Sequence, residues 1–203
     1  MCAYVEAEAI SARGWELRQL LLGTLGVLAI TTEFSSGMIR ATFAAAPRRP
    51  LVLAAKAAVL GAVTLAAGEV TSFAAFLAGQ AVLQAPAPHA TLGQPGVLRA
   101  TAMAGAYPAL IALIGLGIGA IIRHTAGAIC ALVGVLFVQP LLFISPSLQN
   151  AGQNFLPHPM VNALTAVTPL PGTLPYGLIF ALLCSYAMAA LAAGAWALTR
   201  RDA

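Results

Sequence analysis

The chain has 203 residues, of which 60% are hydrophobic and only 8% are charged, and its mean hydropathy is +0.90. No Asp, Glu, Lys or Arg occurs between His124 and Thr199, which excludes a soluble domain because such a domain needs charge on its exposed faces. The net charge of +4 comes from cations at the ends of apolar runs, a pattern that argues against nucleic-acid binding and for an all-α, polytopic transmembrane bundle.

Five apolar stretches are candidates for membrane spans, since a bilayer core needs roughly 20 apolar residues in helix. The first, at about 17–32, is short unless Trp15 anchors it at the interface and the helix continues past its end. Arg, Lys, Pro or polar clusters bound the other four, which are 57–83, 100–122, 126–144 and 174–198. We therefore expect one transmembrane domain over residues 1–203 with about five spans.

Lys and Arg gather in alternate connections, which predicts the orientation of the bundle because loops rich in these residues stay in the cytoplasm. Cations occur in 33–56, at Arg123 and in the tail at 200–201. The connections 84–98 and 145–173 contain none. The sequence thus predicts a multi-pass protein of the cell membrane with its N-terminus outside and its C-terminus in the cytoplasm.

The segment 33–49 has the pattern of a short amphipathic helix at the inner membrane surface. Its apolar face consists of Met38, Ile39, Phe43 and Ala46. Arg40 lies off that face, Pro47 ends the helix, and Arg48 and Arg49 follow at headgroup level. Two interpretations stay open on these grounds: an interfacial helix that turns the chain round, or a docking element for a cytoplasmic partner.

Four motifs resemble the permease subunits of type-2 ABC exporters, especially those of actinobacteria. The first is a Glu-aromatic-x-x-Gly-Met-Ile-Arg segment that ends in Pro-Arg-Arg between two apolar helices. The others are Leu53–Lys56 at the entry to the next span, Arg123–Ile129 between two later spans, and the tail Arg200–Asp202. The resemblance covers nearly the whole chain and depends on the order and spacing of short motifs.

The resemblance implies that the first cytoplasmic loop is a coupling helix against a separate ATP-binding subunit. It assigns coupling to Glu33, Gly37, Arg40, Pro47, Arg48 and Arg49, with Gly37 permitting the bend out of the span. It also implies a second permease chain, as a homo- or heterodimer in membrane lipid, that exports an amphiphilic substrate. No G-x-x-x-x-G-K-[ST] phosphate loop occurs, so ATP would be hydrolysed by the partner.

The chain departs from this family at its start, because such permeases usually have six spans with both termini inside. Residues Met1 to Glu16 resemble the outer loop that would follow the missing first span. A late annotated start is the favoured explanation, and a truncated gene is the other. The family would also place short re-entrant helices in the outer loop Pro140–Pro175.

Glu69 lies near the middle of the second span, where a carboxylate is costly and is a functional candidate by default. The alternative is that Glu69 holds helices together through hydrogen bonds, on a polar face shared with Thr64, Thr71 and Ser72. Gly115 and Gly119 have the spacing of a helix-packing motif.

No residue pattern predicts catalysis, so we expect no enzyme activity, no cofactor and no metal. The histidines His89, His124 and His158 fall in three different loops, and the three cysteines are far apart. Two other functions remain open: a non-transporting membrane scaffold or immunity protein, and an ion-coupled transporter that uses Glu69.

Overall fold

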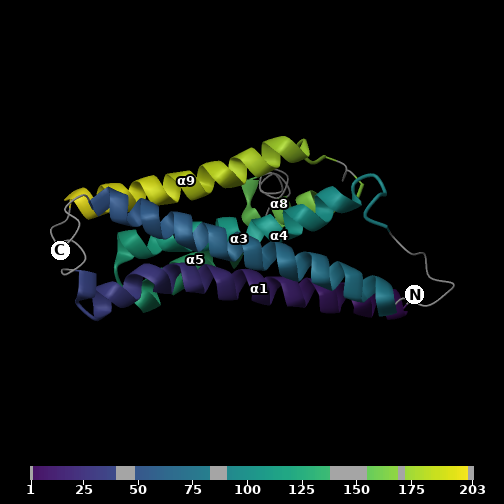
Figure 1. Cartoon of the computed structure of the whole chain (residues 1–203), viewed down its shortest axis with the longest axis horizontal. Helices are drawn as coiled ribbons and strands as arrows, with labels where there is room; N and C mark the ends of the chain where they lie inside the picture. The colour runs from purple at the N-terminus through teal and green to yellow at the C-terminus, as the bar shows by residue number, and fades with distance from the viewer. Residues whose placement is uncertain (1, 40–48, 83–90, 138–154, 169–171, 201–203) are drawn as a thin grey trace, which may run out of the picture.

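The computed structural model describes residues 2–39, 49–82, 91–137, 155–168 and 172–200 (Figure 1). Within these ranges all regular secondary structure is helical. The helices are α1 (Cys2–Ser35), α3 (Arg49–Val82), α4 (Val97–Ile122), α5 (Thr125–Phe137), α8 (Pro157–Thr165) and α9 (Tyr176–Arg200). The predicted all-α fold is confirmed.

In the part of the chain that the structure describes, four helices are long and apolar enough to cross a membrane, and they match four of the five predicted spans. The apolar parts are Leu17–Ser35, Pro50–Ala81, Val97–Ile122 and Tyr176–Arg200. The predicted span 126–144 corresponds to α5, whose 13 residues extend about 20 Å and do not cross a core of about 30 Å. The remainder of that predicted span lies outside the described residues.

Residues 2–16 belong to α1, so the part described of the expected outer loop Met1 to Glu16 is helical, and the candidate span begins after it at Leu17. Alanine and glutamate are strong helix formers, and no proline or glycine precedes Gly14. The helix also continues past Thr32, its predicted end, to Ser35. There the Thr32 hydroxyl donates to Leu28 O at 2.7 Å and the Ser35 hydroxyl to Thr32 O at 3.0 Å.

Helix α4 lies at the centre of the bundle, in contact with α1, α3, α5, α8 and α9. Figure 1 shows α1, α3 and α9 running along its length on different sides. Most of its residues are buried, including Tyr107, Ile111 and Leu116. The span that touches every other described helix therefore sets how these helices are placed.

Small residues on α4 allow its neighbours to approach closely, which confirms the packing predicted for Gly115 and Gly119. A Cβ atom on Gly115 would overlap the carbonyl oxygen of Gly23 in α1, and one on Gly119 would lie 2.8 Å from a methyl of Ile30. On another side, a Cβ on Gly117 would lie 2.5 Å from the backbone of Ala190 in α9. Close backbone approach of this kind drives helix association in lipid.

Arg123, at the end of α4, ties three helix ends together. It has φ 60°, so the chain leaves α4 in the left-handed region. One guanidinium nitrogen donates to Ala197 O in the last turn of α9 at 3.1 Å, and the guanidinium lies 5.2 Å from the centre of the Phe34 ring at the end of α1. The C-terminal ends of α1, α4 and α9 therefore share one end of the bundle.

Arg99 makes an equivalent connection at the opposite end of α4. Its guanidinium donates to Leu164 O at 3.0 Å and to Ala166 O at 2.7 Å, which are carbonyls at the C-terminal end of α8. It also lies 3.4 Å from the centre of the Tyr176 ring at the start of α9. A cation at a helix C-terminus is favoured by the helix dipole, so this one side chain fixes α8 against both α4 and α9.

Candidate functional site

The residues assigned to coupling lie at the end of α1 and in the connection to α3. Glu33 is in α1 and Gly37 follows it, and both are described. Arg40, Pro47 and Arg48 lie outside the described residues. Arg49 begins α3, but its side chain is not among those described.

The chain turns at Gly37, directly after α1 ends at Ser35. Gly37 has φ 73°, a left-handed conformation that glycine adopts without steric cost. Ile39, two residues later, is 5% exposed, whereas Met38 is 62% exposed. Only one of these two residues of the predicted apolar face is therefore buried in the bundle, and Phe43 and Ala46 lie outside the described residues.

Glu33 is bound within the chain. Its Oε1 accepts a hydrogen bond from Nζ of Lys56 at 2.6 Å, which joins α1 to α3. Lys56 Nζ also donates to Ala29 O, one turn earlier on α1, at 3.2 Å. The resemblance implied that Glu33 faces a partner or lipid headgroups. In the structure its carboxylate connects the two helices between which the loop lies.

The hydroxyl groups near Glu69 bond to backbone rather than to its carboxylate. Thr64 and Thr71 each donate to a carbonyl of their own helix, at 2.7 Å and 2.8 Å. Ser72 donates across to Thr101 O in α4 at 2.7 Å. Glu69 itself is partly exposed and lies against Gly105 of α4, where a Cβ would come within 2.7 Å of its carboxyl carbon.

Arg18 meets α4 one residue before Gly105, at a carbonyl that a proline has freed. Pro108 lies inside α4 and has no N–H, so the usual bond to the carbonyl four residues earlier, that of Ala104, is missing. A terminal nitrogen of Arg18 donates to Ala104 O. The neighbouring Gln19 is fully buried, and its Oε1 accepts from the Tyr107 hydroxyl at 3.1 Å.

Arg18 on α1 and Glu69 on α3 therefore approach the same point of α4 from two sides, and their charges attract each other. Among the described side chains, the only direct ion pair is that of Glu33 with Lys56. The sequence singled out Glu69 but not Arg18. The available signal was Pro108, because the carbonyl that it frees within a span needs a donor from another helix.

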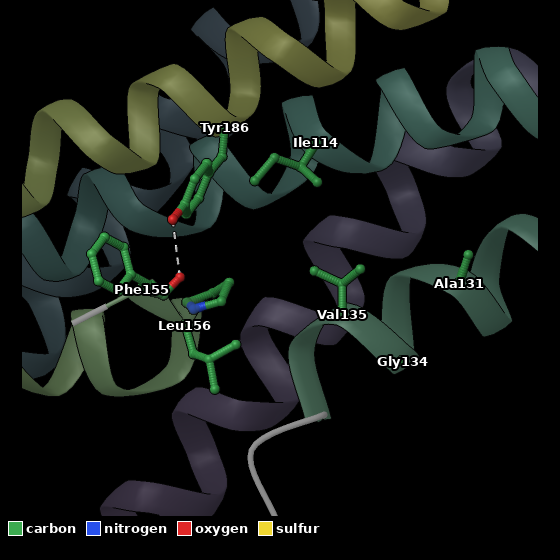
Figure 2. Close-up of a pocket in the computed structure, with 8 residues that line it drawn as sticks. Ile114, Ala131, Gly134, Val135, Phe155, Leu156 and Tyr186 are labelled. Atoms are coloured by element: carbon green, nitrogen blue, oxygen red, sulfur yellow. Dashed lines mark hydrogen bonds between the residues drawn. The ribbon is translucent and has the colours of Figure 1, made fainter. Parts of the chain in front are cut away.

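An apolar hollow of about 480 Å³ lies between α4, α5, α9 and the residues that lead into α8 (Figure 2). Ile114, Val135 and Leu156 contribute to its wall. The hydroxyl of Tyr186 donates to Phe155 O at 3.1 Å, as the dashed line in Figure 2 shows. With its polar groups bonded to each other, the hollow offers apolar contact but no specific chemistry.

Among the described residues no group of three or more His, Cys, Asp or Glu side chains could hold a metal ion. Comparison with protein-family models, curated proteins and solved structures found no match to this chain. Its composition, its four long apolar helices and its charged contacts inside the bundle are those of an all-α membrane protein.

Proposed function

We propose that the chain is the membrane-spanning permease subunit of an ATP-driven exporter. In this proposal it pairs with a second permease chain and moves an amphiphilic substrate outward, while a separate subunit hydrolyses ATP. The loop that begins at Gly37 is the docking site for that subunit, and the C-terminus lies in the cytoplasm on the same side.

The observation that carries this proposal is the connection of α1 to α3 where the loop emerges. Glu33 and Lys56 bind each other at 2.6 Å, and Lys56 also holds Ala29 O. A force on the loop between these helices would therefore move α1 and α3 together rather than only bending a flexible connection. A coupling element needs this property, whereas a simple interfacial turn does not.

The first test concerns the genes beside this one and the complex that they encode. We expect an adjacent reading frame with a phosphate-loop motif, whose product co-purifies with this chain. Reversing Arg40 and Arg48 to Glu should weaken that co-purification, because the docking surface would then carry the wrong charge. Arg200→Glu, which changes a cation at the same end of the bundle outside the loop, is the matched control.

A second pair of variants tests the connection itself. Glu33→Gln and Lys56→Gln should each retain the ATP-binding subunit, while ATP hydrolysis in proteoliposomes becomes less dependent on exported substrate. Loss of the partner in these variants, or retention of the partner by the Arg40 and Arg48 variant, would contradict the proposal. If the Arg40 and Arg48 variant retains the partner, the loop is an interfacial turn, as a non-transporting scaffold or immunity protein would have.

An ion-coupled transporter is the second candidate, and the proximity of Glu69 to Arg18 favours it over the scaffold. The two transport mechanisms differ in their energy source. For the ATP-driven exporter, export from proteoliposomes stops without ATP and continues after a protonophore has removed the proton gradient. Export that needs the gradient and not ATP would replace the proposal with ion coupling.

A further inference from the structure

Within the described part of the chain, Arg18 and Glu69 have charged hydrogen-bonding groups without a partner where α1 and α3 meet α4. Among the described residues, Nε of Arg18 and Nε2 of Gln19 are buried and have no hydrogen-bond partner. No described donor bonds to the Glu69 carboxylate, which is partly exposed. Unpaired polar groups are costly at membrane depth, so groups kept in this arrangement point to a ligand.

The two charges together restrict what that ligand can be. An anion that bound Arg18 would be repelled by Glu69, and a simple cation that bound Glu69 would be repelled by Arg18. A molecule with an anionic group and an ammonium group satisfies both side chains at once. Guanidinium groups pair well with phosphate, and a carboxylate accepts hydrogen bonds from a primary ammonium.

The position along the bundle places Arg18 and Glu69 inside the membrane core but nearer to one boundary than to the other. On α1, Arg18 is 15 residues from Glu33, which corresponds to about 22 Å along the helix. On α3, Glu69 is 13 residues from Lys56, or about 20 Å. The core of a bilayer is about 30 Å thick, so when the Glu33–Lys56 pair lies at one boundary, Arg18 and Glu69 lie toward the other.

Helix α4 presents very small residues where Arg18 and Glu69 approach it. Ala104 accepts a hydrogen bond from Arg18, and Gly105 lies against Glu69. Next to them a hollow of about 290 Å³ is lined partly by Ser72, Thr101 and Ala104. This hollow lies between α3, α4 and the end of α8, about one helical turn along α3 from Glu69, so a headgroup has room there beside the two charges.

We propose that Arg18 and Glu69 bind a zwitterionic headgroup, with its phosphate at Arg18 and its primary ammonium at Glu69. A phosphoethanolamine headgroup has this chemistry, either on a lipid or as a soluble compound. The site lies away from the docking loop, and its binding is measured without an ATP-binding subunit. Failure of this inference therefore leaves the proposed exporter function untouched, and the reverse also holds.

The test uses the purified full chain and phospholipids with identical acyl chains, with bound lipid measured by native mass spectrometry. We expect phosphatidylethanolamine to bind at least fivefold more tightly than phosphatidylcholine, whose quaternary ammonium has no N–H to donate. Phosphatidylglycerol, which lacks the ammonium, should also bind more weakly. Equal binding of the three lipids to the unaltered protein would overturn the proposal without the need for any variant.

Two variants then test which side chain binds the ammonium and which binds the phosphate. Glu69→Gln should reduce the preference for phosphatidylethanolamine over phosphatidylcholine to near one, and Arg18→Gln should weaken both lipids about tenfold. Arg200→Gln and Glu33→Gln, which change the same residue types elsewhere, should leave the preference unchanged. If the lipid preference is unchanged in Glu69→Gln, or if the control variants reduce it equally, Arg18 and Glu69 interact only with each other and bind no headgroup.

Soluble phosphoethanolamine tests whether the ligand is a lipid or a water-soluble compound. If it displaces the bound lipid at millimolar concentration, the headgroup alone is recognised and a water-soluble ligand can use the site. If it does not displace the lipid while the lipid preference holds, the ligand comes from the bilayer and its acyl chains contribute to binding.

Discussion

Pro108 shows how one residue in a span determines the position of a charge on another helix. It removes one backbone hydrogen bond of α4, and Arg18 supplies a donor to the carbonyl that is left over. Lipid offers no water to satisfy that carbonyl, so the donor has to come from the protein. The proline thus gives a physical reason for an arginine in the bundle.

This relationship predicts that the two residues are energetically coupled. In Pro108→Ala the backbone bond to Ala104 O can form, so Arg18→Gln should cost less stability in that background than in the unaltered chain. We expect a coupling energy of about 1 kcal/mol in a double-mutant cycle, measured by unfolding in detergent. Arg99→Gln combined with Pro108→Ala is the control, and its effects should add. Additivity of Arg18 and Pro108 as well would contradict the explanation.

Some helix contacts require glycine, because a side chain at that position would overlap the neighbouring helix. A Cβ on Gly26 of α1 would overlap the backbone of Ala112 in α4, whereas one on Gly79 of α3 has no atom within 4 Å. Gly26→Ala should therefore destabilise the protein by about 1–3 kcal/mol. Gly79→Ala should be neutral or stabilising by up to about 1 kcal/mol. Thermal unfolding in detergent checks both, and equal effects would show that α1 and α4 are not so closely packed.

At the level of elements, one side chain from α4 holds the C-terminal end of α8. Arg99 binds two carbonyls at its C-terminal end and the Tyr176 ring. The sequence left this residue unexplained, although it is the first cation after a connection that has none. The Arg99 guanidinium binds the C-terminal carbonyls of α8 and the Tyr176 ring. These contacts explain why a cation lies at the end of the bundle away from the predicted cytoplasmic side.

Arg99→Gln should therefore loosen α8 while the long helices remain in place. We expect amide exchange in 157–166 to accelerate about tenfold, which corresponds to about 1.4 kcal/mol. Arg99→Lys keeps the charge but loses the planar guanidinium. Amide exchange in this variant should therefore be faster than in the unaltered chain and slower than in Arg99→Gln. Arg200→Gln, which removes a guanidinium 5.2 Å from the Trp196 ring at the far end of α9, should leave exchange in α8 unchanged. Unchanged exchange in Arg99→Gln would mean that apolar packing alone holds α8.

The sequence predicted elements well where a long apolar run decides the structure, as in α3, α4 and α9. It did not predict that residues 2–16 are helical, since the family resemblance suggested an outer loop there although helix propensity is high. Contacts between helices could not be predicted from runs alone. The Glu33–Lys56 pair and the approach of Arg18 to Glu69 depend on which faces of α1 and α3 meet α4, and no sequence period specifies that.

At the scale of the whole molecule, three connections predicted to be cytoplasmic meet at one end. Phe34, Arg123 and Ala197 lie together there. The distribution of cations predicts that this end faces the cytoplasm. In a chain without its native cysteines, Ser36→Cys should react with a membrane-impermeant maleimide only in inside-out vesicles, and Thr91→Cys only in intact cells. Both side chains are exposed. The reverse labelling pattern would invert the topology.

The two arginines of α4 also limit how the bundle can move. Each end of this helix holds the C-terminal carbonyls of another helix, α8 through Arg99 and α9 through Arg123. Sliding α4 along its axis, or rotating it about that axis, would break contacts at both ends at once. We therefore expect α4, α8 and α9 to move as one unit, and a change of shape to involve α1 and α3 tilting against α4 across their glycine contacts.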